Sequence, residues 1–499
     1  MKPEYDLVAL GGGTTGLVAA LTVAEMGGSA ALIEEDRPGG DCLYTGCMPS
    51  KTVLASAELA HRMRTADAVA IDPVDPHPDF AKVMKRVEAV IEQVGAKDSP
   101  EYLESKGIDV VAARGRFDGP GRIVAGEREL TYRVALIATG SSPTIPPIPG
   151  LGDADPLTNE TVFDLREQPE RLAIIGGGPI GIELGQAFCR LGSEVHIFEA
   201  LPRLCPREEA DACELIEDIL VGEGVHVHTR AEVLRVEPNG GGAGRVLLGA
   251  DAASVPDAVD PDSDSRGPAS ESVPFDRVLV AAGRTASTDD LGLESVGVEL
   301  TEDGAIKVNS RLKTTGSHIY AGGDVVGRLL FTHVAAYHGL VAVANGLFRA
   351  RRKAEERWIP WVTFTDPEIA RVGLTEAEAR DALGKEPLVF RIERSGVDRA
   401  VAASQTAGFS KLVADRRGRL LGATLVGTSA GESIGELARL VRDRAKVAEV
   451  SQMVYAYPTF ANAVQLAANE WWGFKYFTPK GRRRFQRALG FLRRVDRPR

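Results

Sequence analysis

The chain has 499 residues, which at roughly 150 residues per domain is enough for about three domains. Hydrophobic residues make up 44% and charged residues 26% of the composition, a globular profile that excludes a disordered, collagenous or disulfide-scaffold protein. The formal net charge of -11 argues against general nucleic-acid binding. Five cysteines in this length favour a reducing, cytoplasmic compartment, where a disulfide would be catalytic or sensing.

The N-terminal residues predict a βαβ unit. An apolar strand over 5–10 is followed by a glycine turn over 11–16, an Ala-rich helix over 17–26 and a strand over 29–33. The basic region and long apolar segment of an export signal are missing here, so we expect the first strand of a domain. No stretch approaches the roughly 18 to 20 apolar residues that a membrane-spanning helix needs.

The same order of elements returns over residues 171–198, with a second glycine turn at 176–181. In a GxGxxG turn the first glycine permits the sharp turn, the second lets a pyrophosphate approach the backbone, and the third lets helix and strand pack closely. The phosphate then lies at the helix N-terminus. The glycines at these positions are Gly11, Gly13, Gly16, Gly176, Gly178 and Gly181.

An acidic residue follows each glycine turn at about 20 residues, at the end of a predicted strand. These residues are Glu34 and Glu199. Such a carboxylate accepts hydrogen bonds from ribose hydroxyls and repels a 2′-phosphate, so Glu199 favours NADH over NADPH. Arg203 and Arg207 lie nearby in the sequence and leave NADPH open.

Two dinucleotide turns predict an α/β fold with two Rossmann-type, three-layer domains. Later strands are expected over 133–138, 275–281 and 319–324. A mixed α/β part follows, with strands over 362–365, 409–414 and 420–426 and helices over 376–382 and 430–442. Residues 239–274, rich in Gly, Asp, Ser and Pro, are expected to be a hairpin and solvated loop. The expected parts are 1–150 with 285–355, 151–284, 356–470 and a tail over 471–499.

Cys42 and Cys47 lie within the segment 39–51, where their spacing allows a bridge across the start of a helix. Two buried thiols or half of a metal site are the alternatives. No second Cys or His pair follows with zinc-type spacing, so we predict no metal site. A helix start with Lys51 close by is expected to lower the pKa of both thiols, and the thiolate is the reactive form.

The segment 39–51 resembles the GGxCxxxGCxPSK signature of the flavin-dependent pyridine nucleotide-disulfide oxidoreductases. The resemblance extends to about residue 470. It includes the sequences Ala-Thr-Gly at 138–140, Ala-Gly-Arg at 282–284, Ala-Gly-Gly-Asp at 321–324 and Phe-Thr-Asp-Pro-Glu at 364–368. It implies a homodimeric enzyme in which FAD binds to the first domain, NAD(P)H to the second, and 356–470 forms an α+β dimerisation domain.

The resemblance also implies roles for single residues. Cys47 would lie against the flavin, Cys42 would be the thiol that meets the substrate, and Lys51 and Glu183 would form an ion pair beside the flavin. Asp324 would bind the ribityl and pyrophosphate region of FAD. The cofactor-binding residues that it implies are Gly11, Gly13, Gly16, Glu34, Lys51, Thr139, Gly140, Gly176, Gly178, Gly181, Glu199, Gly283 and Asp324.

The chain departs from the family near its C-terminus. Disulfide-reducing members carry a His-Pro-Thr-x-x-Glu pattern, contributed by the partner subunit, where this chain has Tyr457 and Asn462. With a reference pKa near 10, tyrosine is a poor proton acceptor at neutral pH, and loss of a positioned base costs about 10²- to 10⁴-fold in rate. Tyr455 cannot replace that base. Efficient turnover of lipoamide or glutathione disulfide is therefore not expected.

Asp41 in the cysteine segment and the sequence over 158–165 resemble the mercuric-reductase-like branch, whose members also carry a tyrosine at the position of Tyr457. This resemblance implies a thiol-bound or soft-metal acceptor. This chain lacks the C-terminal cysteine pair of those enzymes, since no cysteine follows Cys213. The alternatives are a dihydrolipoyl dehydrogenase-like reductase, a flavoprotein that reduces quinone or oxygen, and a non-enzymatic redox sensor. Cys189 is expected in a core, and Cys205 and Cys213 are expected to be inert rather than paired or metal-bound.

The tail over 471–499 carries ten basic residues and one acid. Phe485, Leu489 and Leu492 recur at helical spacing opposite arginines. This pattern fits an amphipathic helix on an anionic membrane surface, a solvated extension or a helix that closes the dimer.

Overall fold

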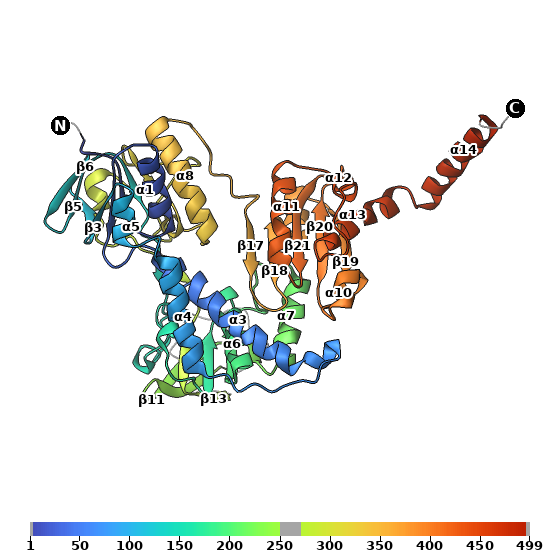
Figure 1. The fold of residues 1–499 in the computed structure, drawn as a ribbon, viewed down its shortest axis with the longest axis horizontal. Coiled ribbons are helices and arrows are strands. Elements are labelled where there is room, and N and C mark those ends of the chain that lie inside the picture. Colours follow the sequence, from blue (N-terminus) through green and yellow to red (C-terminus); the bar gives the residue numbers. More distant parts are fainter. Residues whose placement is uncertain (1–2, 250–270, 496–499) are drawn as a thin grey trace. The chain divides into compact units, whose positions relative to one another are not determined.

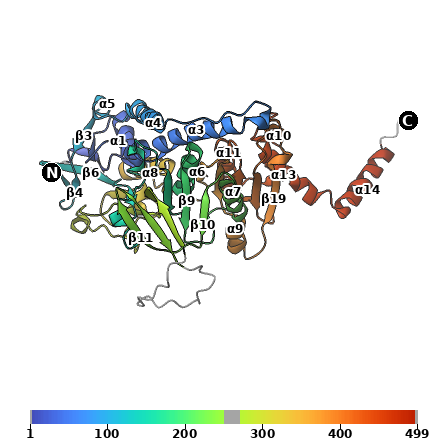
Figure 2. The same cartoon turned by 90° about the horizontal axis from the view of Figure 1, so that it is seen from below.

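The structure is a computed structural model that describes residues 3–249 and 271–495. The chain forms two compact units (Figures 1 and 2). Unit 1 contains residues 1–65, 73–204 and 219–356, and unit 2 contains 66–72, 205–218 and 357–499. Unit 2 is therefore assembled from three separate stretches of the sequence.

The first sheet of unit 1 holds the N-terminal βαβ unit. Its strand order is β3-β2-β1-β6-β5-β4, and β16 also pairs with β6. The pairs β1–β2, β2–β3, β1–β6 and β16–β6 are parallel, whereas β5–β6 and β4–β5 are antiparallel. The strand bounds are β1 Tyr5–Leu10, β2 Ala30–Glu34, β3 Ile108–Ala112, β4 Gly115–Phe117, β5 Arg122–Ala125, β6 Arg128–Ile137 and β16 Ile319–Ala321.

Helices α1 and α8 pack together beside this sheet. The Thr15 hydroxyl donates to the Ala335 carbonyl across the two helices at 2.9 Å. Their apolar side chains share one core with β1 and β6. The helix bounds in this part of the chain are α1 Thr14–Glu25, α2 Gly40–Tyr44, α3 Cys47–Arg64, α4 Phe80–Gly95, α5 Pro100–Ser105 and α8 Thr332–Phe348.

The second βαβ unit lies in a four-stranded parallel sheet of order β10-β9-β8-β14. Helix α6 packs against β8 and β9. The strand bounds are β8 Arg171–Ile175, β9 Glu194–Glu199, β10 His226–Thr229 and β14 Arg277–Val280, and α6 spans Pro179–Leu191. Pro179 is the first residue of α6, and Gly192, with φ of +117°, ends the helix. Both residue types are preferred at these helix ends.

A three-stranded antiparallel sheet, β11-β12-β13, shares a core with the four-stranded sheet. Its strands are β11 Val233–Gly240, β12 Ala243–Leu248 and β13 Glu271–Phe275. The segment predicted as a hairpin and solvated loop thus holds a β11–β12 hairpin and two strands with buried residues, and its remainder over 250–270 lies outside the described residues. The strand predicted over 275–281 is divided at Asp276, because Phe275 ends β13 of the three-stranded sheet and Arg277 begins β14 of the four-stranded sheet. The Asp276 carboxylate accepts the Arg171 backbone N–H at 2.8 Å and pairs with the Arg171 guanidinium.

Unit 2 is built on a five-stranded antiparallel sheet of order β17-β18-β21-β20-β19. Helices α11 and α13 pack on it around one apolar core. The strands are β17 Pro360–Thr363, β18 Ile369–Gly373, β19 Leu388–Glu393, β20 Phe409–Ala414 and β21 Leu420–Val426. The helices are α9 Glu376–Leu383, α10 Asp398–Ala402, α11 Ala430–Arg442, α12 Val447–Ser451, α13 Asn462–Lys475 and α14 Pro479–Val495, and α7 Ala210–Gly222 begins in this unit.

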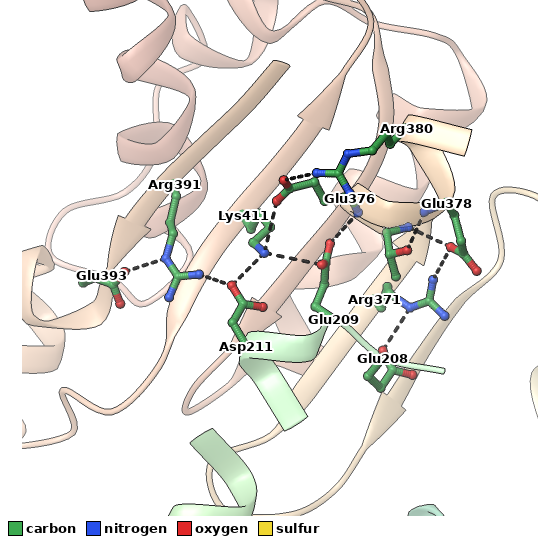
Figure 3. Close-up of polar contacts among 11 residues, drawn as sticks. Glu208, Glu209, Asp211, Arg371, Glu376, Glu378, Arg380, Arg391, Glu393 and Lys411 are labelled. Atoms are coloured by element: carbon green, nitrogen blue, oxygen red, sulfur yellow. Dashed lines mark hydrogen bonds and ion pairs between the residues drawn. The ribbon is translucent and has the colours of Figure 1, made fainter. Parts of the chain in front are cut away.

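Buried ion pairs join residues 205–218 to the sheet of unit 2 (Figure 3). The Lys411 ammonium on β20 lies 2.7 Å from Asp211 and 3.4 Å from Glu209. The Arg371 guanidinium on β18 lies 2.9 Å from Glu208. Four of these five side chains are at most 6% exposed. Burying such a charge without a partner of opposite charge would cost several kcal/mol, so the pairing is what allows these groups to be buried.

The C-terminal helix α14 confirms the helix expected in the tail. None of its described side chains is buried. In the part of the chain that the structure describes, no helix is long and apolar enough to span a membrane.

Candidate functional site

The first glycine turn lies between β1 and α1 and is built as the sequence predicts. Gly11 has φ of +106°, and a Cβ there would be 2.3 Å from the Ala138 carbonyl oxygen. A Cβ on Gly16 would be 2.0 Å from the carbonyl oxygen of Gly11. A Cβ on Gly13 would meet nothing within 4 Å, so the turn has an open surface at the N-terminus of α1, where a pyrophosphate fits.

The second glycine turn repeats this geometry between β8 and α6. Gly176 has φ of +115°, with its virtual Cβ 2.4 Å from the Ala281 oxygen, and a Cβ on Gly181 would be 2.0 Å from the Gly176 oxygen. Gly178 is again open. Helix and strand therefore approach closely at two points, and one face of each turn is left free for phosphate.

Glu34 and Glu199 occupy equivalent places at the ends of β2 and β9. Glu34 accepts the Gly12 N–H at 2.6 Å, and Glu199 accepts the Gly177 N–H at 2.7 Å. Each carboxylate has about four acceptor positions. Both therefore keep acceptor positions for the ribose hydroxyls, beside the open surface of their own turn.

The cysteine pair lies at the start of α3. Cys47 is the first residue of α3, Cys42 lies in α2, and both are thiols. The Cys42 thiol donates to Cys47, which lowers the pKa of Cys47 to about 6 and raises that of Cys42. The Thr332 hydroxyl, 3.3 Å from the Cys47 sulfur, and the Lys51 ammonium add to the lowering. The expectation that both thiols have a lowered pKa is therefore wrong for Cys42, because one shared hydrogen bond stabilises only the accepting thiolate.

Lys51 and Glu183 form the expected ion pair. The Lys51 ammonium on α3 donates to Glu183 on α6 at 2.7 Å, and the side chains are 33% and 7% exposed. The pair joins the helix that carries Cys47 to the helix that follows the second glycine turn. It thus places a fixed cation close to the cysteine pair and to the N-terminal half of α6.

A polar network surrounds Asp324, which begins the turn after β16. Burial raises the pKa of Asp324, and its carboxylate accepts the Ser141 hydroxyl at 3.0 Å. Arg284 donates to the Ser141 hydroxyl at 2.7 Å and to the Asn159 side chain at 3.0 Å, and it also pairs with Asp41. A partly buried carboxylate held this way fits the hydroxyl groups of a ribityl chain, and Asp41 connects the network to the cysteine segment.

The glycines around this network are also placed as expected. Thr139 and Gly140 follow β6, and the Thr139 hydroxyl donates to the Ser287 carbonyl at 2.6 Å. Gly140 and Gly283 have φ of +72° and +131°, and a Cβ on either would meet nothing within 4 Å. Both positions favour glycine and leave open backbone near Ser141. The functional roles of all these residues remain predictions.

Tyr457 lies in unit 2, 71% exposed, and its hydroxyl donates to Asp398 at 2.7 Å. This hydrogen bond raises the pKa of Tyr457. Tyr455 donates to Glu436 at 2.6 Å, and burial raises its pKa. Both phenols therefore stay protonated at neutral pH, and neither is a general base.

Comparisons with known proteins cover most of the chain. Residues 5–339 match the pyridine nucleotide-disulphide oxidoreductase family, and residues 359–468 match the dimerisation domain of the same family. This chain belongs to that family. The family binds FAD and uses NAD(P)H, and its members are enzymes that act on sulfur groups or Hg(II).

Relatives of two activities are similar to this chain. It is 36% identical to a mercuric reductase from Streptomyces lividans, over 93% of this chain and 95% of the relative. It is 32% identical to a dihydrolipoyl dehydrogenase from Bacillus subtilis, over 94% and 98%. Among solved structures, LpdA from Mycobacterium tuberculosis has a TM-score of 0.82 at 28% identity, over 93% of this chain and 99% of that one. The acceptor is thus not fixed by similarity.

Several residues of the site were not found by sequence reasoning. Thr332, Ser141, Asn159 and Arg284 come from parts of the chain far from the cysteines and the glycine turns. His338 also belongs to this group, since it is fully buried on α8, accepts the Gly323 N–H at 3.2 Å and lies 3.5 Å from Glu356. Two of them carried a signal: Arg284 ends the Ala-Gly-Arg sequence at 282–284, and Asn159 lies within the segment 158–165.

Proposed function

We propose that this protein is an NADH-dependent flavoenzyme that passes electrons through the Cys42–Cys47 pair to a thiol-bound or soft-metal acceptor such as Hg(II). The observation that carries the proposal is the cysteine pair at the start of α3, with one thiolate of lowered pKa and one protonated thiol. Two thiols of this kind bind a soft ion well. They also reform a disulfide when they are oxidised.

The chain's residues divide the work. When bound, FAD would accept a hydride from NADH and pass the electron pair to the disulfide. Glu199 and the open backbone at Gly178 orient NADH, while Lys51, fixed by Glu183, supplies positive charge. Cys47 holds the thiolate, and Cys42 keeps the proton until the acceptor arrives. In balance, NADH and Hg(II) give NAD⁺, H⁺ and Hg(0).

The C-terminal sequence favours the soft-metal acceptor over a disulfide. Reducing a dithiol disulfide requires a base that moves a proton from thiol to leaving sulfur. Tyr457 stands where disulfide-reducing relatives carry histidine, and its raised pKa makes it a donor only. A metal ion bound by thiolates needs no such base. The similarity to the Streptomyces lividans mercuric reductase supports the same choice.

The test uses the FAD-loaded protein, reduced anaerobically with NADH. Hg(II) with excess thiol, lipoamide, glutathione disulfide and a quinone are then added one at a time. We expect sustained NADH oxidation with Hg(II) alone, loss of it in Cys42→Ser and in Cys47→Ser, and retention in the control Cys189→Ser. Turnover with lipoamide would contradict the proposed soft-metal acceptor. Quinone turnover that survives Cys42→Ser would overturn the electron path.

We further propose a cytoplasmic homodimer whose α14 lies on an anionic membrane surface. The match to a dimerisation domain supports the dimer, and the low cysteine content supports the compartment. Exposed Phe485, Leu492 and Val495 on a helix rich in arginine support the surface contact. Vesicles with anionic lipid should pellet the full chain at low salt and release it at high salt. Equal pelleting after deletion of 481–499 would contradict the membrane contact.

A further inference from the structure

A group of imidazole and carboxylate side chains gathers at one edge of the four-stranded sheet, outside the site described above. The edge strand β10 lies beside β9 (Figure 2). His196 on β9 and His226 on β10 are directly paired across these two parallel strands. Glu194 lies two residues before His196 on β9, so its side chain is on the same face of the sheet. Two rigid neighbouring strands therefore bring three potential metal ligands together.

The distances support a single ion-binding site. One potential ligand atom from each of Glu194, His196 and His226 lies within 4.8 Å of the other two. The His196 Nε2 atom is 3.1 Å from the Glu194 carboxylate. The rings of His196 and His226 stack with centroids 4.3 Å apart, so their edges can turn toward one point. Glu194 and His226 are exposed and the His196 side chain is 13% exposed, so an ion from solvent can reach them.

His228 gives this group the outer support that metal-binding histidines usually have. Its Nε2 atom lies 3.1 Å from His196 Nδ1. When Nε2 of neutral His196 donates a hydrogen bond to Glu194, Nδ1 accepts a hydrogen bond from the Nε2–H group of His228. When Nε2 of His196 instead binds an ion, His196 carries its proton on Nδ1 and donates a hydrogen bond to Nε2 of His228. His228 then carries its own proton on its Nδ1 atom. The two tautomers conserve the proton count and keep the His196 ring in place.

We propose that Glu194, His196 and His226 bind a divalent late transition-metal ion, of which Zn(II) is the reference case, with His228 as a positioning residue. Two imidazoles and one carboxylate form a donor set that suits Zn(II), Ni(II) or Cu(II). An all-oxygen set would suit Mg(II) or Ca(II), and a thiolate pair would suit Hg(II). The site is therefore chemically different from the cysteine pair and does not depend on the proposed acceptor.

The position of the site predicts its effect. The glycine turn at 176–181 and Glu199 lie at the carboxyl ends of the strands, where nucleotides bind to such sheets. Glu194 begins β9 and His226 begins β10, at the opposite ends of these strands. A bound ion would thus leave the nucleotide turn free and would fasten the edge strand β10 to β9. We expect it to stabilise the fold without altering NADH binding.

The test uses untagged, FAD-loaded full-length protein with Cys42→Ser and Cys47→Ser, which removes binding to the cysteine pair. After chelator treatment, Zn(II) binding is measured at pH 7.5 by equilibrium dialysis against a chromogenic competitor. We expect one ion per chain and at least a tenfold weaker affinity in His226→Gln and in Glu194→Gln, both exposed substitutions. His77→Gln, at an exposed histidine elsewhere in unit 1, is the matched control and should bind as the parent does.

Cu(II) provides a readout of the ligands themselves. Its electron paramagnetic resonance spectrum should show nitrogen couplings from two imidazoles in the parent and from one in His226→Gln. His228→Phe should keep the stoichiometry and weaken the affinity about 10- to 100-fold, as loss of a second-shell partner does. Unchanged affinity in both His226→Gln and Glu194→Gln, or equal loss in His77→Gln, would overturn the proposal. Flavin content and circular dichroism identify a variant that failed to fold.

Discussion

At the scale of single residues, the asymmetry of the cysteine pair is the main chemical property of the site. One hydrogen bond, from Cys42 to Cys47, moves the two pKa values in opposite directions. The sequence correctly placed both thiols at a helix start. It could not show which thiol accepts, because that depends on side-chain orientation and on Thr332, which lies 285 residues away.

The pH dependence of alkylation tests this asymmetry. In the reduced protein the pKa of Cys47 is about 6, so its alkylation rate should rise with pH through about 6 and level off above about pH 7. Lys51→Met removes a charge that lowers this pKa and should move the midpoint upward, while Glu183→Gln removes one that raises it and should move the midpoint downward. The measurement is iodoacetamide labelling with peptide mass analysis. A Cys47 midpoint near the ordinary thiol value of about 8.5 would contradict the assignment.

The phenol of Tyr457 gives a second prediction for a single residue. Because Tyr457 stays protonated and exposed, we expect it either to donate a proton or to help bind the electron acceptor. Tyr457→Phe should lower kcat with Hg(II) by about 10²-fold. It should leave reduction of the flavin by NADH unchanged in stopped-flow experiments. Tyr102→Phe, at another exposed tyrosine, is the control, and equal rates in all three proteins would remove Tyr457 from the mechanism.

At the scale of elements, the two strand-turn-helix units follow from local sequence. The structure has β20, β21 and α11 with the predicted bounds. The glycine turns also form where expected, because the approaches of Gly16 to Gly11 and of Gly181 to Gly176 lie within the turns themselves. The approaches of Gly11 to Ala138 and of Gly176 to Ala281 depend on neighbouring strands of the sheet that are far apart in the sequence. The metal-ligand group was missed because it combines residues on two strands that are separated in the sequence, and their pairing appears only in the structure.

The second glycine turn allows a contrast between folding and binding. A Cβ on Gly181 would overlap the Gly176 carbonyl oxygen at 2.0 Å, whereas one on Gly178 would point into open space. Gly181→Ala should therefore lower the thermal midpoint. Gly178→Ala should keep the midpoint but raise KM for NADH at least tenfold, because its methyl group occupies the pyrophosphate position. Thermal unfolding and steady-state kinetics measure the two effects, and normal NADH affinity in Gly178→Ala would contradict the assigned role.

The buried charges of unit 2 also belong to the element scale. Lys411→Met would leave Glu209, 6% exposed, without its cation. Breaking a buried pair in this way costs about 3–5 kcal/mol, and we expect the lower end because Asp211 and Glu376 are 32% exposed and reach water. Urea unfolding followed by circular dichroism measures the loss. The control Lys307→Met, in an exposed pair with Glu299, should cost less than about 1 kcal/mol. Equal costs would contradict the importance of burial.

At the scale of the whole molecule, the chain passes between the two units repeatedly. Residues 66–72 and 205–218 belong to unit 2, although their sequence neighbours belong to unit 1. Sequence patterns did not predict this, because the decisive contacts join Glu208 and Glu209 to residues more than 160 positions away. The linear boundary 151–284 stays a prediction, and residues 205–218 within it pack in unit 2.

The remaining cysteines report on this arrangement. Cys205 and Cys213 are 3% and 1% exposed in unit 2, and the Cys213 thiol donates to the Cys205 carbonyl at 3.3 Å. Both should resist a maleimide in the native, reduced protein while Cys47 reacts. In rising urea they should become reactive together with the loss of unit 2, and Lys411→Met should shift that transition to lower urea. Reactivity of either cysteine in the native protein would contradict the packing of this segment.

The segment over 205–218 has a consequence for exchanging parts between relatives. A chimera that replaces only residues 357–499 would set a foreign β18 and β20 against the native Glu208, Glu209 and Asp211. These carboxylates would stay paired only if the relative's sequence carried cations at the positions of Arg371 and Lys411. A transplant that also carries 66–72 and 205–218 would move a self-consistent body. To exchange unit 2 between relatives, three separate segments of the coding sequence must therefore be exchanged together.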